Sequence, residues 1–158
     1  MKKLDFFDLK LCEKIGRMFE YAVSHDGLDI FMFTKQWLVS DTFHRILEWD
    51  VPLVSQSHTY ILNSFQNEIK GMGMDLQKSV CMAPLECIYW GGYIFTYWCI
   101  WEEISGEDIV RAYKIDEVIS NAYIYHSLSV KTSISMIKDD FPLIHSDKPD
   151  LQNDEQER

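Results

Sequence analysis

Residues 86–101 read ECIYWGGYIFTYWCIW, and this aromatic run decides which kind of fold the chain adopts. A Gly-Gly pair between two aromatic segments is one signal for a β-hairpin. However, the apolar residues of this region also recur with the three- and four-residue spacing of an α-helix: Trp90, Tyr93, Ile94, Tyr97, Trp101 and Ile104. Pro84 suits the first turn of such a helix, and Glu86 complements its positive end. The stretch therefore predicts a helix, with a hairpin as the alternative.

This helix is expected to be central to the fold or to lie at an interface. Apolar side chains also occupy its opposite side, at Phe95, Trp98 and Ile100, so no face is left polar. Gly91 and Gly92 each cost about 1 kcal/mol relative to alanine in a helix interior. A close approach by a second helix would offset this cost. Alternatively, the glycines form the floor of a shallow site where a partner docks among the aromatic residues.

Three further helices are expected before this run. Residues 6–23 place apolar side chains on one face and end at Gly27, a typical helix cap. Residues 29–49 form a second helix, which Ser40-Asp41 divides into two in an alternative reading, and which Asp50-Val51-Pro52 stops. A third helix follows at residues 57–70. The side chains predicted to face inward include Phe6, Ile15, Met18, Phe19, Phe33, Trp37, Phe43, Tyr60, Ile61 and Phe65.

Residues 71–75, Gly-Met-Gly-Met-Asp, predict a flexible joint between two halves. After the central run, a capping box at Ser105 begins a helix over residues 106–113. Two more are expected at 116–125, with Tyr123 inward, and at 130–140, capped by Ser129. The prediction is an all-α, single compact domain of six or seven helices over 1–145, with helical sub-halves 1–70 and 76–145. An acidic, disordered tail follows at 146–158.

Charge and cysteine usage narrow the function classes. The 158 residues carry a formal net charge of −10, which disfavours direct binding to nucleic acid. Cys12 and Cys99 lie within apolar helical patterns and no secretory leader is evident, so reduced thiols and a cytoplasmic location are expected. No stretch has the roughly 18 uninterrupted apolar residues of a membrane span, so no membrane partner is expected.

No motif for catalysis or for metal binding is present. The nucleotide-binding, nucleophile-elbow and zinc patterns are all missing, and the five histidines do not pair at metal-ligand spacing. Glu107 and Asp108 lie at the start of a predicted helix, where negative charge is stabilising, and this explains their presence without a catalytic role. The chain is therefore predicted to have no catalytic residue, no metal and no cofactor, and not to be an enzyme.

The second half resembles a family of small bacterial proteins of unknown function, often encoded beside toxin genes. The resemblance lies in a W-x-G-Y-I-x-x-Y-W element at residues 90–98, followed by a polar helix start and by a Y-H-x-L element at residues 125–128. It implies an antitoxin-like role, in which the protein binds and neutralises a neighbouring toxin. The partner-binding residues expected on this basis are Trp90, Tyr93, Tyr97, Trp98, Trp101, Tyr125 and His126.

Three alternatives to this hypothesis remain open. One is an acidic inhibitor or decoy protein carried by a mobile element. Its surface carboxylates would imitate nucleic-acid phosphates, which requires a stripe of acidic residues on one face. Another is an enzyme whose site is not readable from the sequence, which requires a pocket holding a titratable group with a shifted pKa. The last is a homodimer that uses the Trp90–Trp101 face, and it is compatible with binding a protein partner.

Overall fold

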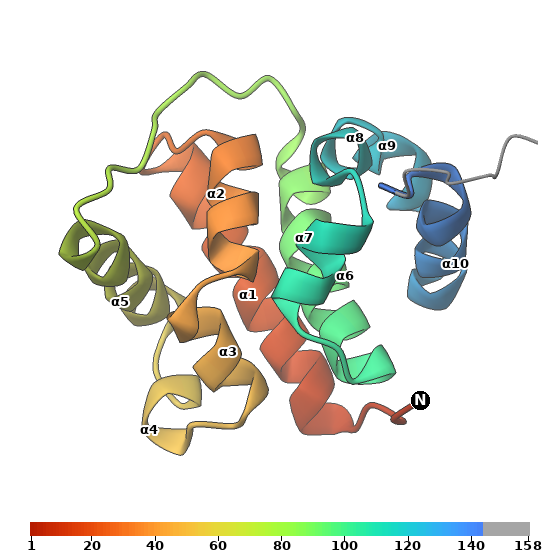
Figure 1. Ribbon diagram of the computed structural model, residues 1–158, viewed down its shortest axis with the longest axis horizontal. Helices are drawn as coiled ribbons and strands as arrows, with labels where there is room; N and C mark the ends of the chain where they lie inside the picture. Colours follow the sequence, from red (N-terminus) through yellow and green to blue (C-terminus); the bar gives the residue numbers. More distant parts are fainter. Residues whose placement is uncertain (144–158) are drawn as a thin grey trace, which may run out of the picture.

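The computed structural model describes residues 1–143, whose helices pack into one body around a shared core (Figure 1). Within these residues there are ten helices and no strand. In chain order they are α1 (Phe6–Ser24), α2 (Ile30–Leu38), α3 (Asp41–Leu47), α4 (Val51–Val54), α5 (His58–Gly71), α6 (Leu85–Glu102), α7 (Gly106–Ala112), α8 (Ile115–Ser120), α9 (Ala122–Tyr125) and α10 (Val130–Asp140). The predicted all-α class is confirmed, and the aromatic run belongs to a helix rather than to a hairpin.

The centre of the fold is the pair of helices α1 and α6, which lie side by side (Figure 1). A methyl group on Gly92 would lie 2.7 Å from the Ile15 carbonyl oxygen and 2.8 Å from the Phe19 ring. On α1, a methyl group on Gly16 would lie 2.8 Å from the Tyr89 ring. Glycine at these positions lets the two backbones approach closely, and this contact offsets the low helix propensity of Gly92.

Two of the expected helices are each divided into two, the first of them as its alternative reading predicted, and α4 was not expected; together these differences give ten helices instead of the six or seven predicted. In the first, the Ser40 side chain accepts a hydrogen bond from the Phe43 amide at 3.1 Å and starts α3 after α2 has ended. In the second, residues 116–125 divide at Asn121 into α8 and α9. Short polar side chains that bond to nearby backbone groups favour such helix ends over helix interiors.

Side-chain caps fix the ends of several helices. Ser57, Ser105 and Ser129 accept hydrogen bonds from the amides of Tyr60, Asp108 and Thr132, and the predicted capping box at Ser105 is present. A second capping box, between Asp5 and Asp8, starts α1 and was not predicted. These caps satisfy backbone amides that have no partner within the helix.

The segment 72–84 joins the two predicted halves and is held against the turn between α1 and α2. The Asp29 amide donates to the Gln77 carbonyl at 2.9 Å, and the Ser79 amide donates to the Gly27 carbonyl at 3.1 Å. Because α1 from the first half packs on α6 from the second, the halves share one core. The predicted tail, residues 146–158, lies entirely outside the described residues.

Three aromatic side chains that were predicted to face inward are instead exposed. Phe6, Tyr60 and Tyr123 are 65%, 51% and 64% exposed. Phe6 and Tyr60 lie in the first turns of α1 and α5, where helical spacing does not reveal which residues a neighbouring helix covers. Tyr123 lies in α9, and the break at Asn121 changes the register that the prediction assumed. The other inward predictions given above are correct.

None of the helices in residues 1–143 is both long enough and apolar enough to cross a membrane.

Candidate functional site

The exposed face of α6 is a single row of aromatic rings. Between Cys87 and Ile100, every residue is buried except Tyr89, Tyr93 and Tyr97. Trp101 continues the row by one helical turn and is also half-buried. Successive ring centroids along the row lie 6.1, 6.4 and 6.2 Å apart. We call Tyr89, Tyr93, Tyr97 and Trp101 the aromatic stripe.

Helical spacing explains why the stripe is continuous. Residues four apart lie above one another on a helix surface, so the stripe covers one line along α6. Tyr93, Tyr97 and Trp101 pack against the core, and the Tyr89 ring lies against Gly16 of α1. The hydroxyl groups of Tyr89, Tyr93 and Tyr97 have no hydrogen-bond partner within residues 1–143, in contrast to the side chains of Trp98 and Tyr125.

Burial dominates the electrostatics of the stripe. Partial burial raises the pKa of Tyr93 to about 12, and burial also raises the pKa of Tyr89 and of Tyr97. These tyrosines are therefore neutral hydrogen-bond donors at physiological pH. At the end of the stripe, the Lys131 ammonium lies 5.5 Å from the centre of the Trp101 ring, a cation–π contact.

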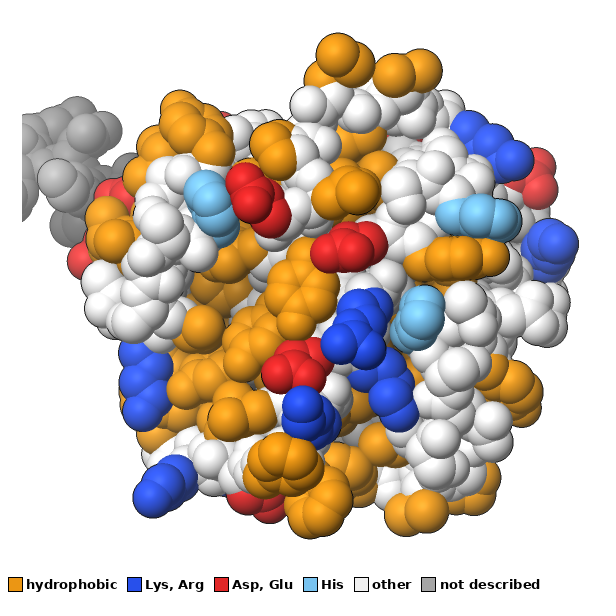
Figure 2. Space-filling model, turned by 180° about the vertical axis from the view of Figure 1, so that it is seen from behind, with side chains coloured by type: hydrophobic (Ala, Val, Ile, Leu, Met, Phe, Trp, Pro, Cys, Tyr) orange, Lys and Arg blue, Asp and Glu red, His pale blue; other side chains and the backbone are white. Residues whose placement is uncertain are grey.

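Charged side chains border the stripe. Figure 2 shows the molecule from behind, where hydrophobic side chains form a band beside interspersed acidic and basic groups. Glu13, Arg17 and Glu20 of α1 lie close enough to influence the Tyr89 hydroxyl. At the other end, the Lys138 ammonium donates to Glu102 at 2.7 Å. An apolar centre with a charged border is the usual composition of a protein interface.

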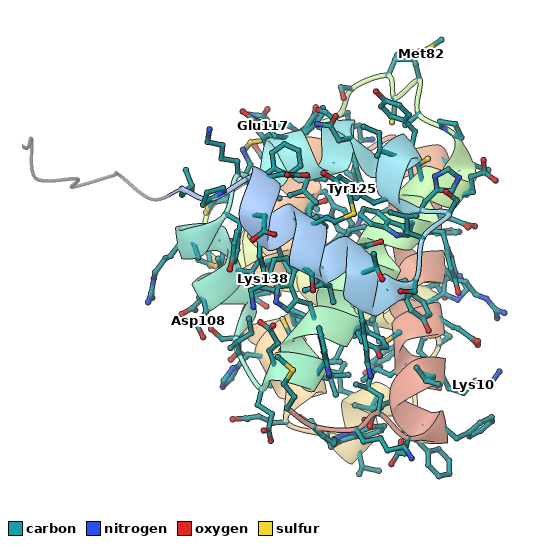
Figure 3. All side chains as sticks on the ribbon, turned by 90° about the vertical axis from the view of Figure 1, so that its right-hand side faces the viewer. Lys10, Met82, Asp108, Glu117, Tyr125 and Lys138 are labelled. Carbon is teal, nitrogen blue, oxygen red and sulfur yellow. The ribbon has the colours of Figure 1, made fainter. Side chains whose placement is uncertain are left out.

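Three of the predicted partner-binding residues are core residues. Trp90, Trp98 and Tyr125 are 7%, 0% and 2% exposed. The Trp98 indole N–H donates to Glu102 Oε2 at 2.8 Å, and the Tyr125 hydroxyl donates to Asp140 Oδ2 at 2.7 Å. Figure 3 shows Tyr125 between its own helix and α10. Their burial removes these three side chains from any surface site.

The other four predicted residues are only partly buried. Tyr93, Tyr97 and Trp101 are neighbours in the stripe. His126 lies at the opposite end of α6, where its Nε2 is 3.9 Å from Glu86 Oε1. The prediction missed Tyr89, although the repeat of Tyr89, Tyr93 and Tyr97 at four-residue spacing was a signal for it.

The described residues do not assemble an evident catalytic or metal centre. No group of three His, Cys, Asp or Glu side chains able to hold a metal ion occurs within residues 1–143. His25 Nδ1 lies 2.8 Å from Asp26, but the histidine side chain is 64% exposed. All four cysteines are free thiols, and burial raises the pKa of Cys12, Cys87 and Cys99. Raised thiol pKa values make these three cysteines poor nucleophiles.

The Tyr125–Asp140 hydrogen bond predicts a dependence of stability on alkaline pH. Burial and this bond raise the pKa of Tyr125 to about 12 from its usual value of 10.0. The bond therefore contributes fully below pH 10, and its contribution is lost as the pH rises toward 12. Tyr125→Phe should lower the free energy of unfolding at pH 8 by about 1.5 kcal/mol.

Urea unfolding at pH 8 and at pH 11 would measure this effect. The loss of stability between the two pH values should be smaller in Tyr125→Phe than in the unmodified protein. Tyr93, whose pKa is also raised, leaves part of the alkaline dependence in both proteins. An equal pH dependence in both proteins would contradict the role given to Tyr125.

The chain shows no significant similarity to a known family, to a curated protein or to a solved structure, so no comparison assigns it to a family.

Proposed function

We propose that this protein is a non-catalytic protein-binding module of the antitoxin-like kind, which neutralises a toxin encoded beside it by direct contact. The observation that carries the binding role is the aromatic stripe, the only solvent-facing part of α6 between Cys87 and Ile100. The antitoxin-like part rests on the resemblance of the second half. The proposal includes a cytoplasmic location and no cofactor.

The amino-acid composition of the stripe supports a protein partner. Tyrosine and tryptophan are the residues most enriched at the energetic centre of interfaces, since each combines a large rigid ring with a hydrogen-bond donor. Three adjacent tyrosine hydroxyls without partners in residues 1–143 offer donors that a complex could satisfy. An apolar partner surface with acceptors opposite these hydroxyls would match the stripe.

The charges around the stripe indicate its orientation on the partner. Glu13, Arg17 and Glu20 border the end near Tyr89, so two acidic groups and one basic group lie there, whereas Lys131 lies over Trp101 at the other end. A partner with basic groups facing the Tyr89 end would be complementary to this arrangement. Complementary charges of this kind set the orientation and the association rate more than the affinity.

The test is to express the chain together with the product of the adjacent gene. We expect a stable complex on size-exclusion chromatography at micromolar concentration, and loss of the neighbouring protein's toxicity in the same cells. Absence of a complex at that concentration would overturn the proposal. Light scattering on the free protein distinguishes a homodimer from a monomer, because a dimer formed through the stripe would show twice the monomer mass.

A further inference from the structure

A second feature is an open hollow between α1 and α4, which no residue of the aromatic stripe lines. Its volume is about 410 Å³, within the range of small-molecule sites. It is lined by Phe7, Lys10, Leu11, Lys14, Trp49, Val51, Val54 and Ser55. Apart from the two lysines and Ser55, its walls are entirely apolar, and Phe7 and Val51 are each 67% exposed.

One wall of the hollow is held in an unusual backbone conformation. Trp49 has a φ of 57°, in the left-handed region that bulky side chains rarely adopt. Arg45 fixes this turn, since its guanidinium contacts Asp50 Oδ2 from Nη2 at 2.7 Å and from Nε at 2.8 Å. Two backbone hydrogen bonds close the same turn, from the Trp49 amide to the Ile46 carbonyl and from the Asp50 amide to the Arg45 carbonyl, both at 3.1 Å. Trp49 is therefore the left-handed residue of a helix cap at the end of α3, and it places its side chain along the hollow.

The charge in the hollow comes from Lys14. Its ammonium donates to the Val54 carbonyl at 2.7 Å and to the Gln56 carbonyl at 2.9 Å, which fastens the end of α4 to α1. An ammonium has three protons, so one donor remains. No carboxylate of residues 1–143 pairs with Lys14, and partial burial lowers its pKa. A partly desolvated cation beside an apolar wall favours an anionic ligand.

A second cation lies at the lip of the same hollow. Lys10 projects outward from α1 (Figure 3) and contacts Glu13 at 3.1 Å. Both side chains of this pair are substantially exposed, so the contact is weak and the ammonium can turn to another anion. The hollow thus combines an apolar interior with two cationic groups along its α1 side.

We propose that this hollow binds an amphipathic monoanion, a medium-chain carboxylate whose apolar chain lies against Trp49, Val51 and Val54 and whose carboxylate meets Lys14. The positive charge of Lys14 favours this anionic ligand over a neutral or a cationic one. The site is separate from the aromatic stripe, so it can be tested on the protein alone, without a protein partner.

The experiment is isothermal titration of the full chain with decanoate, below its micelle concentration, at pH 7. We expect saturable binding at one site. Octanoate should bind about tenfold more weakly, because two buried methylene groups are lost. Decylammonium has the same chain length but the opposite charge, and it should bind at least about tenfold more weakly than decanoate.

Substitutions locate the site. Val51→Asp places a negative charge at the lip on an exposed position and should weaken decanoate binding at least about tenfold. Val80→Asp is the matched control, since Val80 is 88% exposed and does not line the hollow, and it should leave binding unchanged. Lys14→Met should weaken binding and Lys14→Arg should retain it, with circular dichroism of each variant to verify folding.

Several results would overturn the proposal. They are equal affinity for decanoate and decylammonium, undiminished binding to Val51→Asp, or no decanoate binding at millimolar concentration. If decanoate does not bind but Val51→Asp prevents the complex with the neighbouring gene product, the hollow belongs to a protein interface instead. Only this last outcome bears on the aromatic stripe, because it would place the hollow in the same partner interface.

Discussion

Replacing Gly92 with alanine is expected to lower the free energy of unfolding by about 3 kcal/mol. The added methyl group would lie 2.7 Å from the Ile15 carbonyl oxygen and 2.8 Å from the Phe19 ring. The obstructing oxygen belongs to the backbone of α1, so a side-chain rotation cannot relieve the clash. The two central helices must separate, and the packing between them is lost. Equilibrium unfolding in urea measures the change.

Gly91 provides the matched control for this experiment. It is the preceding residue of the same helix, yet the nearest atom to a methyl group there, Phe19 Cδ2, lies at 3.9 Å, an ordinary van der Waals distance. Gly91→Ala should therefore raise stability by about 1 kcal/mol through helix propensity. Similar effects of Gly91→Ala and Gly92→Ala would contradict the close approach of α1 and α6.

The second large effect is expected from the double substitution Tyr93→Ala and Tyr97→Ala in the aromatic stripe. If the proposed complex uses this stripe, each tyrosine at its centre contributes at least about 2 kcal/mol, or about thirtyfold in affinity. Tyr93 and Tyr97 are stacked neighbours, so their effects are not independent, and the double variant should lose between about thirtyfold and about a thousandfold. Titration calorimetry with the neighbouring gene product measures the affinity.

Two sets of variants control for loss of folding and for the chemistry of the contact. Tyr60→Ala and Tyr123→Ala remove tyrosines that are at least half exposed and lie outside the stripe, and they should bind normally. Tyr93→Phe and Tyr97→Phe retain the rings and remove the hydroxyl groups, so they report the hydrogen bonds alone. If the double alanine variant folds and binds with unchanged affinity, the stripe is not the interface.

The fold could be predicted from helical spacing and capping residues, whereas the exposed side of α6 could not. α6 is apolar around its whole circumference, so its sequence contains no polar face that marks the solvent. Trp90 and Trp98 are therefore equivalent to Tyr93 and Tyr97 in the pattern. Only the positions of α1 and of the C-terminal helices decide which of them are covered.

The hollow beside Trp49 could not be predicted for a different reason. Its walls come from the first turns of α1 and from the segment after α3, which are far apart in the sequence. Trp49 takes the left-handed conformation in the cap that ends α3, and helical periodicity does not indicate that a tryptophan occupies this position. The sequence likewise does not distinguish Lys14 from the other lysines, because only the structure shows its contacts with the carbonyls near α4.

The pairing of α1 with α6 also has a consequence for the order of folding. The main partner of α1 is α6, a helix whose synthesis begins only after α2 to α5 are complete. Until then α1 can pack only against earlier helices such as α5, and forming the full core requires closing a long loop at an entropic cost. We therefore expect this helical protein to fold more slowly than bundles whose neighbouring helices are consecutive in sequence.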